Sequence, residues 1–487
     1  MGVLRRAWAK SPRKNRPALH AGTAAALGSE DRPEALSEGG RQGARPPTPP
    51  RIPRWALWKD PQLLAWNAFL LAASPYLTYL RVHKVLKNKR WDPFLLRRWT
   101  LAGDGNPDPS KPSVLFVCLA QGEFRLARAL AESLDIEEGE ACVTYVVRDP
   151  RLRAHIERSE PSLRCVTLPF DFATPVTRFL RRERPSLVAF IEGCSFPNLV
   201  VGSKIAGAKV VLVNGKAGKC KAAKGVKPRF VRWLARHFDR LAVQDADAWS
   251  DIQKSGALHA KPLVTGNLKF ALLPSPPADE SLRELERWVL ASQDLALVAA
   301  GSTERTTEHR FVLEAFQEAR SASPCRLLLA PRTPHDAELA ARLAQESGLT
   351  VSLRSKGDPP ADVMLLDSLG ELAWSYRYSR AAYVGGALEG KGHNVLEPVA
   401  WGLPVAYGPR RGAHAELQMA CEEAGIGRQV RSPSELAKFW LDSLDATSER
   451  RERDALLAGQ VIAGHQAGFT STVELLREAL TEVGVLR

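Results

Sequence analysis

The sequence predicts an α/β protein with two parallel sheets, each covered by helices on both faces. From Ser113 onward, short apolar runs such as SVLFVCLA alternate with amphipathic stretches such as FRLARALAESL. A second series of the same kind begins at LALVAAGST, beyond the Pro-rich segment LLPSPPADE. Continuously apolar strands separated by helices are typical of parallel sheets that are buried on both faces. Two such series predict two Rossmann-like domains that face a cleft, with ligands bound at the carboxyl ends of the strands.

The order of the apolar runs gives the expected strands and domain boundaries. The first series reads SVLFVCLA, CVTYVV, RCVTLPF, SLVAFIEG, KVVLVNG, RLAVQD and KPLVTGN. The second reads LALVAAGST, RLLLAPR, TVSLRS, VMLLDS, AAYVGG and PVAYG. We therefore expect a tail at 1–54, a helical segment at 55–100, a first sheet domain at 101–273 and a second at 274–487. The final helices of the second domain are expected to cross back to the first.

The charge of the chain points to a polyanionic partner. The net charge is +14, which suits phosphorylated substrates, an anionic membrane surface or nucleic acid. Aromatic residues make up only 7% of the chain, and the sequence contains no RNP-like run, zinc-finger spacing or zipper, so nucleic acid is disfavoured. The seven cysteines are scattered without a CxxC pair, so neither structural zinc nor a disulfide framework is expected.

The first 100 residues contain a basic tail and an apolar segment. Residues 1–54 are rich in Arg, Pro, Gly and Ala and are predicted to be disordered. The segment LLAWNAFLLAASPYLTYL at 63–80 has no charged residue and precedes the basic run RVHKVLKNKR. Because a spanning helix needs about 20 apolar residues, we expect this segment to enter one leaflet with the basic run on anionic lipid. A buried core helix is the alternative.

The most informative motif is VGGALEGKGHNVLEPVAWG, where the strand AAYVGG turns on Gly385 and Gly386. A helix is expected to start near Asn394 and to stop at Gly402. Glycines allow the backbone to approach a ligand closely, and a helix N-terminus offers free N–H groups to phosphate. A carboxylate in the first turn, here Glu397, can accept both hydroxyls of a ribose. The motif therefore predicts a nucleotide-sugar site.

Helix capping is the alternative explanation for part of this motif. Asn394 is a natural N-cap, and Glu397 three residues later makes a variant of the capping box. Capping does not account for Glu389, for His393 or for the glycines between them. The nucleotide-sugar interpretation accounts for all of them together.

Several motifs occur in the order and spacing of one family: TGNLKF, AGST, LAPRTP, DSLGEL and YVGGALEGKGHNVLEP. From about Pro61 to its end, the chain resembles 3-deoxy-D-manno-octulosonic acid (Kdo) transferases, GT-B glycosyltransferases that move Kdo from CMP-Kdo onto lipid A precursor. The resemblance implies a role in lipopolysaccharide core biosynthesis on the cytoplasmic face of the cell inner membrane. It also implies metal-independent chemistry, with no cofactor besides the CMP-Kdo donor.

The resemblance assigns the donor to the second domain and the chemistry to the first. The implied donor-binding residues are Arg332, Leu369, Gly370, Glu371, Asn394 and Glu397. Arginine forks onto phosphate, although a surface cation is the alternative for Arg332. Glu123, in the turn Gln121-Gly122-Glu123 after a strand, matches the proposed general base of the family, which takes the proton of the attacking hydroxyl. Capping by an acid in the first helical turn is the alternative for Glu123.

The acceptor half departs from the family pattern. Glu192, Pro197 and Asn198 match a family segment, but Cys194 replaces its second acid, and VRDPRLR stands in place of a Pro-Thr-Gly turn. The implied acceptor-binding residues are Glu192, Lys216 and Lys219, the lysines opening a basic run at 216–232 that suits a phosphorylated glycolipid or forms a solvated face. Two alternatives stay open: a GT-B transferase with another nucleotide sugar or acceptor, and a non-catalytic membrane-bound binding protein.

Overall fold

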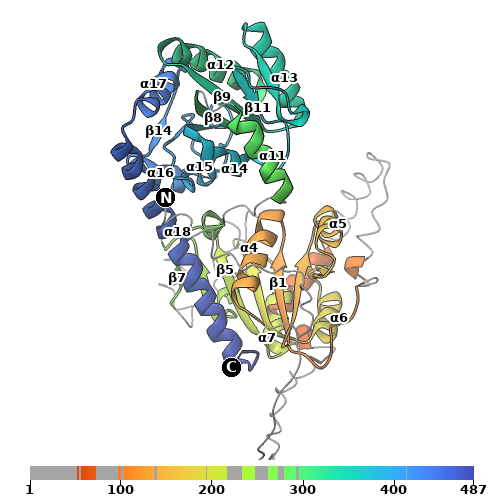
Figure 1. Ribbon diagram of the computed structural model, residues 1–487. Helices are drawn as coiled ribbons and strands as arrows, with labels where there is room; N and C mark the ends of the chain where they lie inside the picture. Colours follow the sequence, from red (N-terminus) through yellow and green to blue (C-terminus); the bar gives the residue numbers. More distant parts are fainter. Residues whose placement is uncertain are drawn as a thin grey trace, which may run out of the picture. The chain divides into compact units, whose positions relative to one another are not determined.

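The computed structural model describes residues 52–53, 56–72, 97–99, 104–136, 140–193, 195–216, 233–246, 261–272, 279–291, 295–412 and 414–486. Within these ranges lie two seven-stranded sheets in which every neighbouring pair of strands is parallel (Figure 1). The strand orders are β3-β2-β1-β4-β5-β6-β7 and β10-β11-β9-β8-β12-β13-β14. The predicted α/β class with two Rossmann-like sheets is confirmed. Most of the predicted tail and the basic runs at 81–90 and 217–232 lie outside the described residues.

Every strand predicted in the first series is present. In chain order the elements are η1 (Ala56–Trp58), β1 (Ser113–Cys118), α4 (Gln121–Ser133), β2 (Cys142–Val147), α5 (Pro150–Ser159), β3 (Arg164–Thr167), α6 (Ala173–Glu183), β4 (Pro185–Ile191), α7 (Pro197–Ile205), β5 (Lys209–Gly215), β6 (Arg240–Val243), β7 (Leu263–Val264) and η2 (Leu268–Ala271). The strand β1 shows why apolar and polar residues do not alternate in these strands. Val114 and Phe116 pack into one core, whereas Leu115 and Val117 pack into another, so both faces of the sheet are buried.

The second series contains all the predicted strands and one more. Its elements are α11 (Asp279–Leu290), β8 (Ala296–Thr303), α12 (Arg305–Ala322), β9 (Cys325–Pro331), α13 (Pro334–Glu346), β10 (Val351–Leu353), η3 (Arg354–Lys356), β11 (Val363–Leu365), α14 (Leu372–Ser375), η4 (Tyr376–Tyr378), β12 (Ser379–Val384), α15 (Leu396–Val399), β13 (Val405–Tyr407), α16 (Ala415–Glu423), β14 (Gly427–Gln429), α17 (Pro433–Leu444) and α18 (Ser448–Glu482). The unpredicted strand β14 reads Gly-Arg-Gln and pairs with β13 at the sheet edge. Its sequence gave no apolar run to recognise.

The expected helix from Asn394 to Gly402 is wrong in length. The helix α15 covers only Leu396–Val399, and its N-cap is Val395. Pro398 has no N–H to donate to the carbonyl of Asn394, so the helix cannot start at that residue, and Gly402 takes a φ of 78° that ends the segment. A helix of one turn has little dipole, so its N-terminus is a weaker phosphate site than the sequence suggested.

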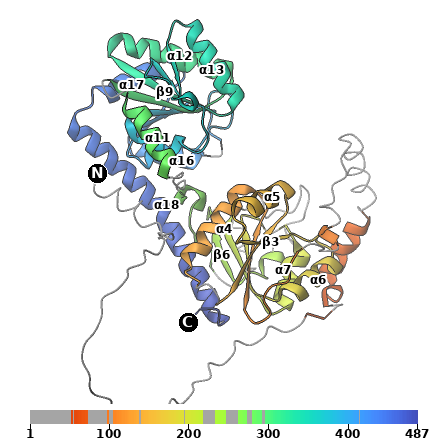
Figure 2. The same ribbon diagram turned by 45° about the vertical axis from the view of Figure 1, so that its right-hand side comes forward.

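The last helix contributes to the core of the first domain. Leu476, Ala479 and Leu480 of α18 pack with Val114 and Phe116 of β1 in one apolar cluster. Figure 2 shows the C-terminal half of α18 running along the first domain. Burying apolar side chains of this size stabilises a fold by about 1 to 3 kcal/mol each. The C-terminal end of the chain is therefore an integral part of the first-domain core.

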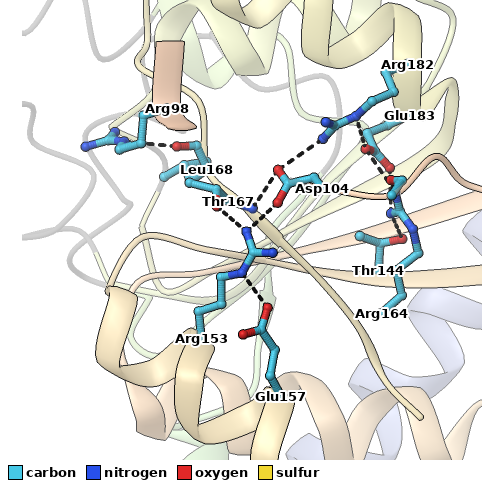
Figure 3. A network of polar contacts seen from close by, with 11 residues as sticks. Arg98, Asp104, Thr144, Arg153, Glu157, Arg164, Thr167, Leu168, Arg182 and Glu183 are labelled. Carbon is cyan, nitrogen blue, oxygen red and sulfur yellow. Dashed lines mark hydrogen bonds and ion pairs between the residues drawn. The ribbon is translucent and has the colours of Figure 1, made fainter. Parts of the chain in front are cut away.

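A buried ionic network supports the edge of the first sheet (Figure 3). Arg153 of α5 contacts Asp104 and Thr167, and Arg164 of β3 donates to Glu183 at 2.7 Å. The carboxylates of Asp104 and Glu183 are fully buried, and each is paired with arginine. Unpaired charges at such positions are strongly destabilising. Arg153 belongs to VRDPRLR, so this departure from the family pattern supplies a structural anchor.

The described part of the apolar segment, residues 61–72, forms a two-faced helix. Leu63 and Asn67 are fully buried, whereas Leu64, Phe69 and Leu71 are 48%, 60% and 55% exposed. Across the residues that the structure describes, no helix combines the length and the apolar character that crossing a membrane requires. One face of this helix is thus bound to the first domain, and the other presents apolar side chains outward.

The glycine turn after β12 packs tightly against the end of β8. A Cβ at Gly385 would lie 2.6 Å from the carbonyl oxygen of Ser302 and 2.7 Å from Cα of Thr303. Both neighbours are backbone atoms, which cannot rotate away. The close approach of two strand ends therefore requires glycine at this position.

We predict that Gly385→Ala lowers the free energy of unfolding by about 1 to 3 kcal/mol, because the methyl group overpacks two backbones. The control is Gly459→Ala in α18, where a Cβ would meet nothing within 4 Å. That change should stabilise the protein by up to about 1 kcal/mol through helix propensity. Urea denaturation of both variants measures the difference. Equal stability of the two variants would contradict the packing at Gly385.

Candidate functional site

Strained backbone marks the carboxyl ends of several strands. Non-glycine residues with positive φ in the described chain are Asp135, Arg184, Glu192, Asn214, Ser302 and Arg305. The first two follow helices, where a left-handed residue is common. The other four lie at or just beyond the ends of β4, β5 and β8, with φ between 55° and 67°. Such conformations cost of order 1 kcal/mol or more and cluster at functional sites.

Glu123 lies in the first turn of α4, directly after β1. Its side chain is 1% exposed, and Oε2 accepts the backbone N–H of Leu119 at 2.6 Å. This bond ties the start of the helix to the end of the strand, but it caps no N–H group of the helix, because Leu119 precedes the N-cap Ala120. A carboxylate that is held in this way has a fixed position, which is also what a general base requires.

A lysine that the sequence analysis did not single out lies beside this turn. Lys269 of η2 forms an ion pair with Glu192, and its Nζ would be 3.2 Å from a Cβ at Gly122. Asn214 Nδ2 also donates to Glu192 at 3.4 Å. Lys269 comes from the motif TGNLKF, immediately after β7, so its place at a carboxyl strand end was the signal that could have revealed it. The first domain therefore gathers two carboxylates and one ammonium group around the ends of β1, β4 and β7.

The remaining residues implied on the acceptor side are only partly described. Lys216 is exposed, and its backbone N–H donates to the carbonyl of Glu192 at 3.1 Å. Lys219 and Cys194 lie outside the described residues. The structure thus connects Lys216 to Glu192 through the backbone alone.

In the second domain a buried carboxylate holds the glycine turn. Glu308 of α12 is 3% exposed and accepts N–H groups from Gly386 at 2.8 Å and from Glu304 at 2.8 Å. It also accepts the hydroxyl of Tyr383 at 2.9 Å. Burial raises the pKa of Glu308 to about 7, while these donors act in the opposite direction. The residue was not recognised from the sequence, where it reads as an ordinary acid in a first helical turn.

The same loop is tied to α12 by exposed charges. Arg305 forms an ion pair with Glu389 at 3.2 Å. The hydrogen bond from Thr307, and then that from Arg305, lower the pKa of Glu389. His393 Nε2 lies 3.8 Å from Glu304, which is too long for a hydrogen bond. Burial, and then the charge of Arg332, lower the pKa of His393. Capping did not explain Glu389 and His393 in the sequence. In the structure Glu389 pairs with Arg305 and His393 lies near Glu304, both on the segment that opens α12.

The structure brings Arg332 and Glu397 into one electrostatic neighbourhood. Arg332 follows β9, is exposed, and donates its backbone N–H to Thr303 at 2.8 Å. Burial raises the pKa of Glu397, whereas the charge of Arg332 opposes that rise. Glu397 in turn contributes to the raised pKa of Tyr376, after burial. Arg332 follows β9 and Glu397 follows β12, the two strands that flank β8 in the sheet. A cation and a carboxylate placed in this way can contact a phosphate and a ribose, respectively.

Asn394 has a local structural role. Its Oδ1 accepts the N–H of Leu396 at 3.1 Å, although the helix N-cap is Val395. The side chain therefore forms a turn that precedes α15 and shapes the end of the glycine loop.

The three implied donor residues in the loop after β11 differ in exposure and in their contacts. Leu369 is 84% exposed, and Gly370 has a φ of 87°. Glu371 is 4% exposed and accepts from Arg354 at 2.9 Å and from Ser368. The carboxylate of Glu371 thus stabilises the loop, and the exposed backbone and side chain of Leu369 lie at its tip. Across the described residues, no three His, Cys, Asp or Glu side chains gather closely enough to hold a metal ion.

Comparisons with known proteins agree on one family. Residues 95–272 match the family described as 3-Deoxy-D-manno-octulosonic-acid transferase (kdotransferase). The chain is 29% identical to the 3-deoxy-D-manno-octulosonic acid transferase of Bordetella pertussis, over 80% of this chain and 93% of that protein. It is 25% identical to the protein of the same name from Haemophilus influenzae, over 85% of this chain and 98% of the relative.

Solved structures give more distant likenesses. The C-terminal CMP-Kdo binding domain of WaaA from Acinetobacter baumannii is 24% identical, covers 37% of this chain and 98% of its own, and has a TM-score of 0.34. A glycosyltransferase from Rickettsia africae is 11% identical, covers 76% of this chain and 99% of its own, and has a TM-score of 0.49.

The raised pKa of Glu308 predicts a specific pH dependence of stability. Between its ordinary value of 4.5 and about 7, the folded protein binds a proton that the unfolded chain releases. The free energy of unfolding should therefore fall as the pH rises through this window, by up to about 3 kcal/mol. Glu308→Gln should remove this component. Urea denaturation of both proteins from pH 4.5 to 7.5 measures it, and identical pH profiles would contradict the raised pKa.

Proposed function

The chain belongs to the Kdo transferase family, and we propose that it transfers Kdo from CMP-Kdo to a lipid A precursor in lipopolysaccharide biosynthesis. The supporting observation is that both sheets carry polar groups at the carboxyl ends of their strands, where such sheets bind ligands. The first domain holds Glu123 beside Lys269 and Glu192. The second holds Arg332 and Glu397 beside a glycine turn.

In the proposed reaction an acceptor hydroxyl attacks the anomeric carbon of Kdo, and the bond from that carbon to the CMP phosphate breaks. Glu123 takes the hydroxyl proton, and CMP leaves with the electron pair of the broken bond. Arg332 stabilises the negative charge that develops on the phosphate. In this scheme Lys269, which follows β7, binds a phosphate of the acceptor and stabilises its negative charge. These side chains supply the positive charge without a metal ion or cofactor.

On the donor side, Glu397 accepts hydroxyl groups of the ribose, and Asn394 shapes the loop that contacts the phosphate. The backbone at Leu369 and Gly370 lies beside the cytosine, and Glu371 holds that loop in place. These roles are supported by the carboxyl-end positions of the three loops and by the burial that raises the pKa of Glu397. On the acceptor side, Glu192, Lys216 and Lys219 bind the phosphorylated glycolipid.

The exposed face of helix 61–72 suits an anionic bilayer. Leu64, Phe69 and Leu71 are about half exposed. A group of large apolar side chains in contact with water is unfavourable and indicates a surface that another apolar surface covers. The basic run RVHKVLKNKR follows within ten residues along the chain, and its charge complements anionic lipid headgroups. A lipid surface is therefore the occupant that both features favour. It would place the protein on the cytoplasmic face of the inner membrane, where a glycolipid acceptor resides.

The first test is transfer from freshly generated CMP-Kdo to a tetraacylated lipid A precursor. Replacing Glu123 by Gln should lower kcat by about 100-fold or more, because the proton loses its acceptor, and should leave the affinity for CMP unchanged. Gln121→Ala, an exposed neighbour on the same turn, is the matched control and should remain active. No transfer by a folded wild-type protein that binds CMP would indicate another sugar or acceptor. Full activity of the Glu123 variant would exclude it as the base.

The membrane proposal predicts a separate effect. Phe69→Ser combined with Leu71→Ser should weaken binding to anionic vesicles by tenfold or more, since each buried side chain contributes about 1.5 to 3 kcal/mol. Gln62→Ala, exposed on the same helix, is the control. Vesicle flotation measures both. Unchanged flotation of the double variant would show that another surface binds the lipid.

A further inference from the structure

The helix α7 is capped by a residue from a distant part of the chain. Asp171, before α6, accepts the N–H of Leu199 at 3.0 Å and the N–H of Asn198 at 3.2 Å. These are two of the N–H groups that the first turn of a helix leaves without a partner in the helix itself. Phe172 and Phe196, the N-caps of α6 and α7, form no side-chain capping bond. The start of α7 therefore depends on Asp171.

Helix 61–72 completes this cap. Asn67 donates to the side chain of Asn198 at 2.9 Å and accepts the first N–H of α6, from Ala173, at 3.0 Å. Trp66 Nε1 donates to the carboxylate of Asp171 at 3.1 Å. One side chain of the apolar helix thus bonds to the starts of both α6 and α7.

This junction, formed by Asn67, Asp171 and Asn198, holds helix 61–72 on the first domain through buried hydrogen bonds. Asn67 and Asn198 are 0% exposed, and a buried polar group that loses its partner costs about 1 to 3 kcal/mol. Moving the helix away would break the hydrogen bonds of several buried polar groups at once. Leu63, also fully buried, adds apolar contact one turn earlier. The helix is therefore fixed to the first domain by specific bonds in addition to apolar packing.

The capped start of α7 is also the end that follows the candidate acceptor site along the chain. The segment between β4 and α7 begins with Glu192, which has a φ of 61° and is paired with Lys269. Asn198 stands six residues later, inside the first turn of α7. The exposed apolar face of helix 61–72 and the β4–α7 segment are thus joined through a single buried junction.

We propose that helix 61–72 positions the β4–α7 segment, so that binding of its apolar face to an anionic lipid surface fixes the segment that carries Glu192. This inference rests on the proposed function for the identity of the acceptor. Asn198, which matches the family segment, acts here as a positioning residue through Asn67 and Asp171. Two features indicate the chemistry of the partner. The exposed side chains of Leu64, Phe69 and Leu71 suit apolar acyl chains, and the basic run RVHKVLKNKR that follows in the sequence suits anionic headgroups.

Hydrogen exchange tests this coupling without any transfer assay. A surface that binds only the docked helix suppresses opening of the junction by a factor of one plus the ratio of lipid concentration to Kd. At tenfold excess over Kd, anionic phosphatidylglycerol vesicles should slow exchange of the Asn198 and Leu199 amides by about tenfold. In Asn67→Ala the vesicles should still bind, and the slowing should disappear. Unchanged exchange in the wild type on vesicle binding would overturn the proposal.

Two further variants distinguish a loss of coupling between lipid binding and the β4–α7 segment from a loss of folding. Gln62→Ala, on the same helix but outside the junction, should keep the full slowing. If Asn67→Ala fails to fold, Trp66→Phe removes one bond to Asp171 and should reduce the slowing part-way. If Trp66→Phe binds vesicles and its amide exchange is slowed as much as in the wild type, the junction does not couple lipid binding to the β4–α7 segment.

A transfer assay then distinguishes this inference from the proposed function. Asn67→Ala should raise KM for vesicle-embedded acceptor by about tenfold and change KM for detergent-dispersed acceptor little, with kcat similar in both. Equal loss in both media would mean that Asn67 is merely structural, which contradicts the proposal. If the wild type transfers nothing, the proposed function fails, while the exchange experiment still decides whether lipid binding reaches the β4–α7 segment.

Discussion

Burial of both faces of each parallel sheet is the constraint on which the rest of this molecule depends. Alternate residues of β1 enter two separate apolar cores, so its length offers no position for a charged group. Polar side chains can emerge only where strands end. The carboxyl ends of β1, β4, β8 and β9 accordingly lead into Glu123, Glu192, the strained Ser302 and Arg332.

Carboxylates at these ends serve largely to hold loops. Glu308 accepts three donors from the glycine turn and its surroundings, Glu371 is enclosed by Arg354 and Ser368, and Glu123 ties α4 to β1. A carboxyl group has two oxygens with several acceptor sites between them, so one acid side chain can hold several donors at once. Loops held in this way present their backbone and neighbouring side chains to a ligand with little loss of entropy on binding.

Two features of the family pattern acquire a structural explanation in this chain. Arg153, within a segment that departs from the pattern, pairs with the buried Asp104 at the edge of the first sheet. Asn198, which matches the pattern, is fully buried and bonded to Asn67 and to the backbone of Asp171. A residue can therefore match a family motif because it holds neighbouring helices together, without contact to a ligand.

The sequence by itself determined the fold class, thirteen of the fourteen strands in the described ranges and the location of the glycine turn, because continuous apolar runs and glycine pairs are local signals. It did not reveal β14, which is polar and pairs with β13 at the sheet edge. It also did not reveal the true length of α15, which Pro398 and Gly402 limit. Lys269, Glu308 and Asn67 owe their significance to partners between 75 and 131 residues away along the chain. Pairings over such distances are decided only when the sheets form, since burial then sets which polar groups must find one another.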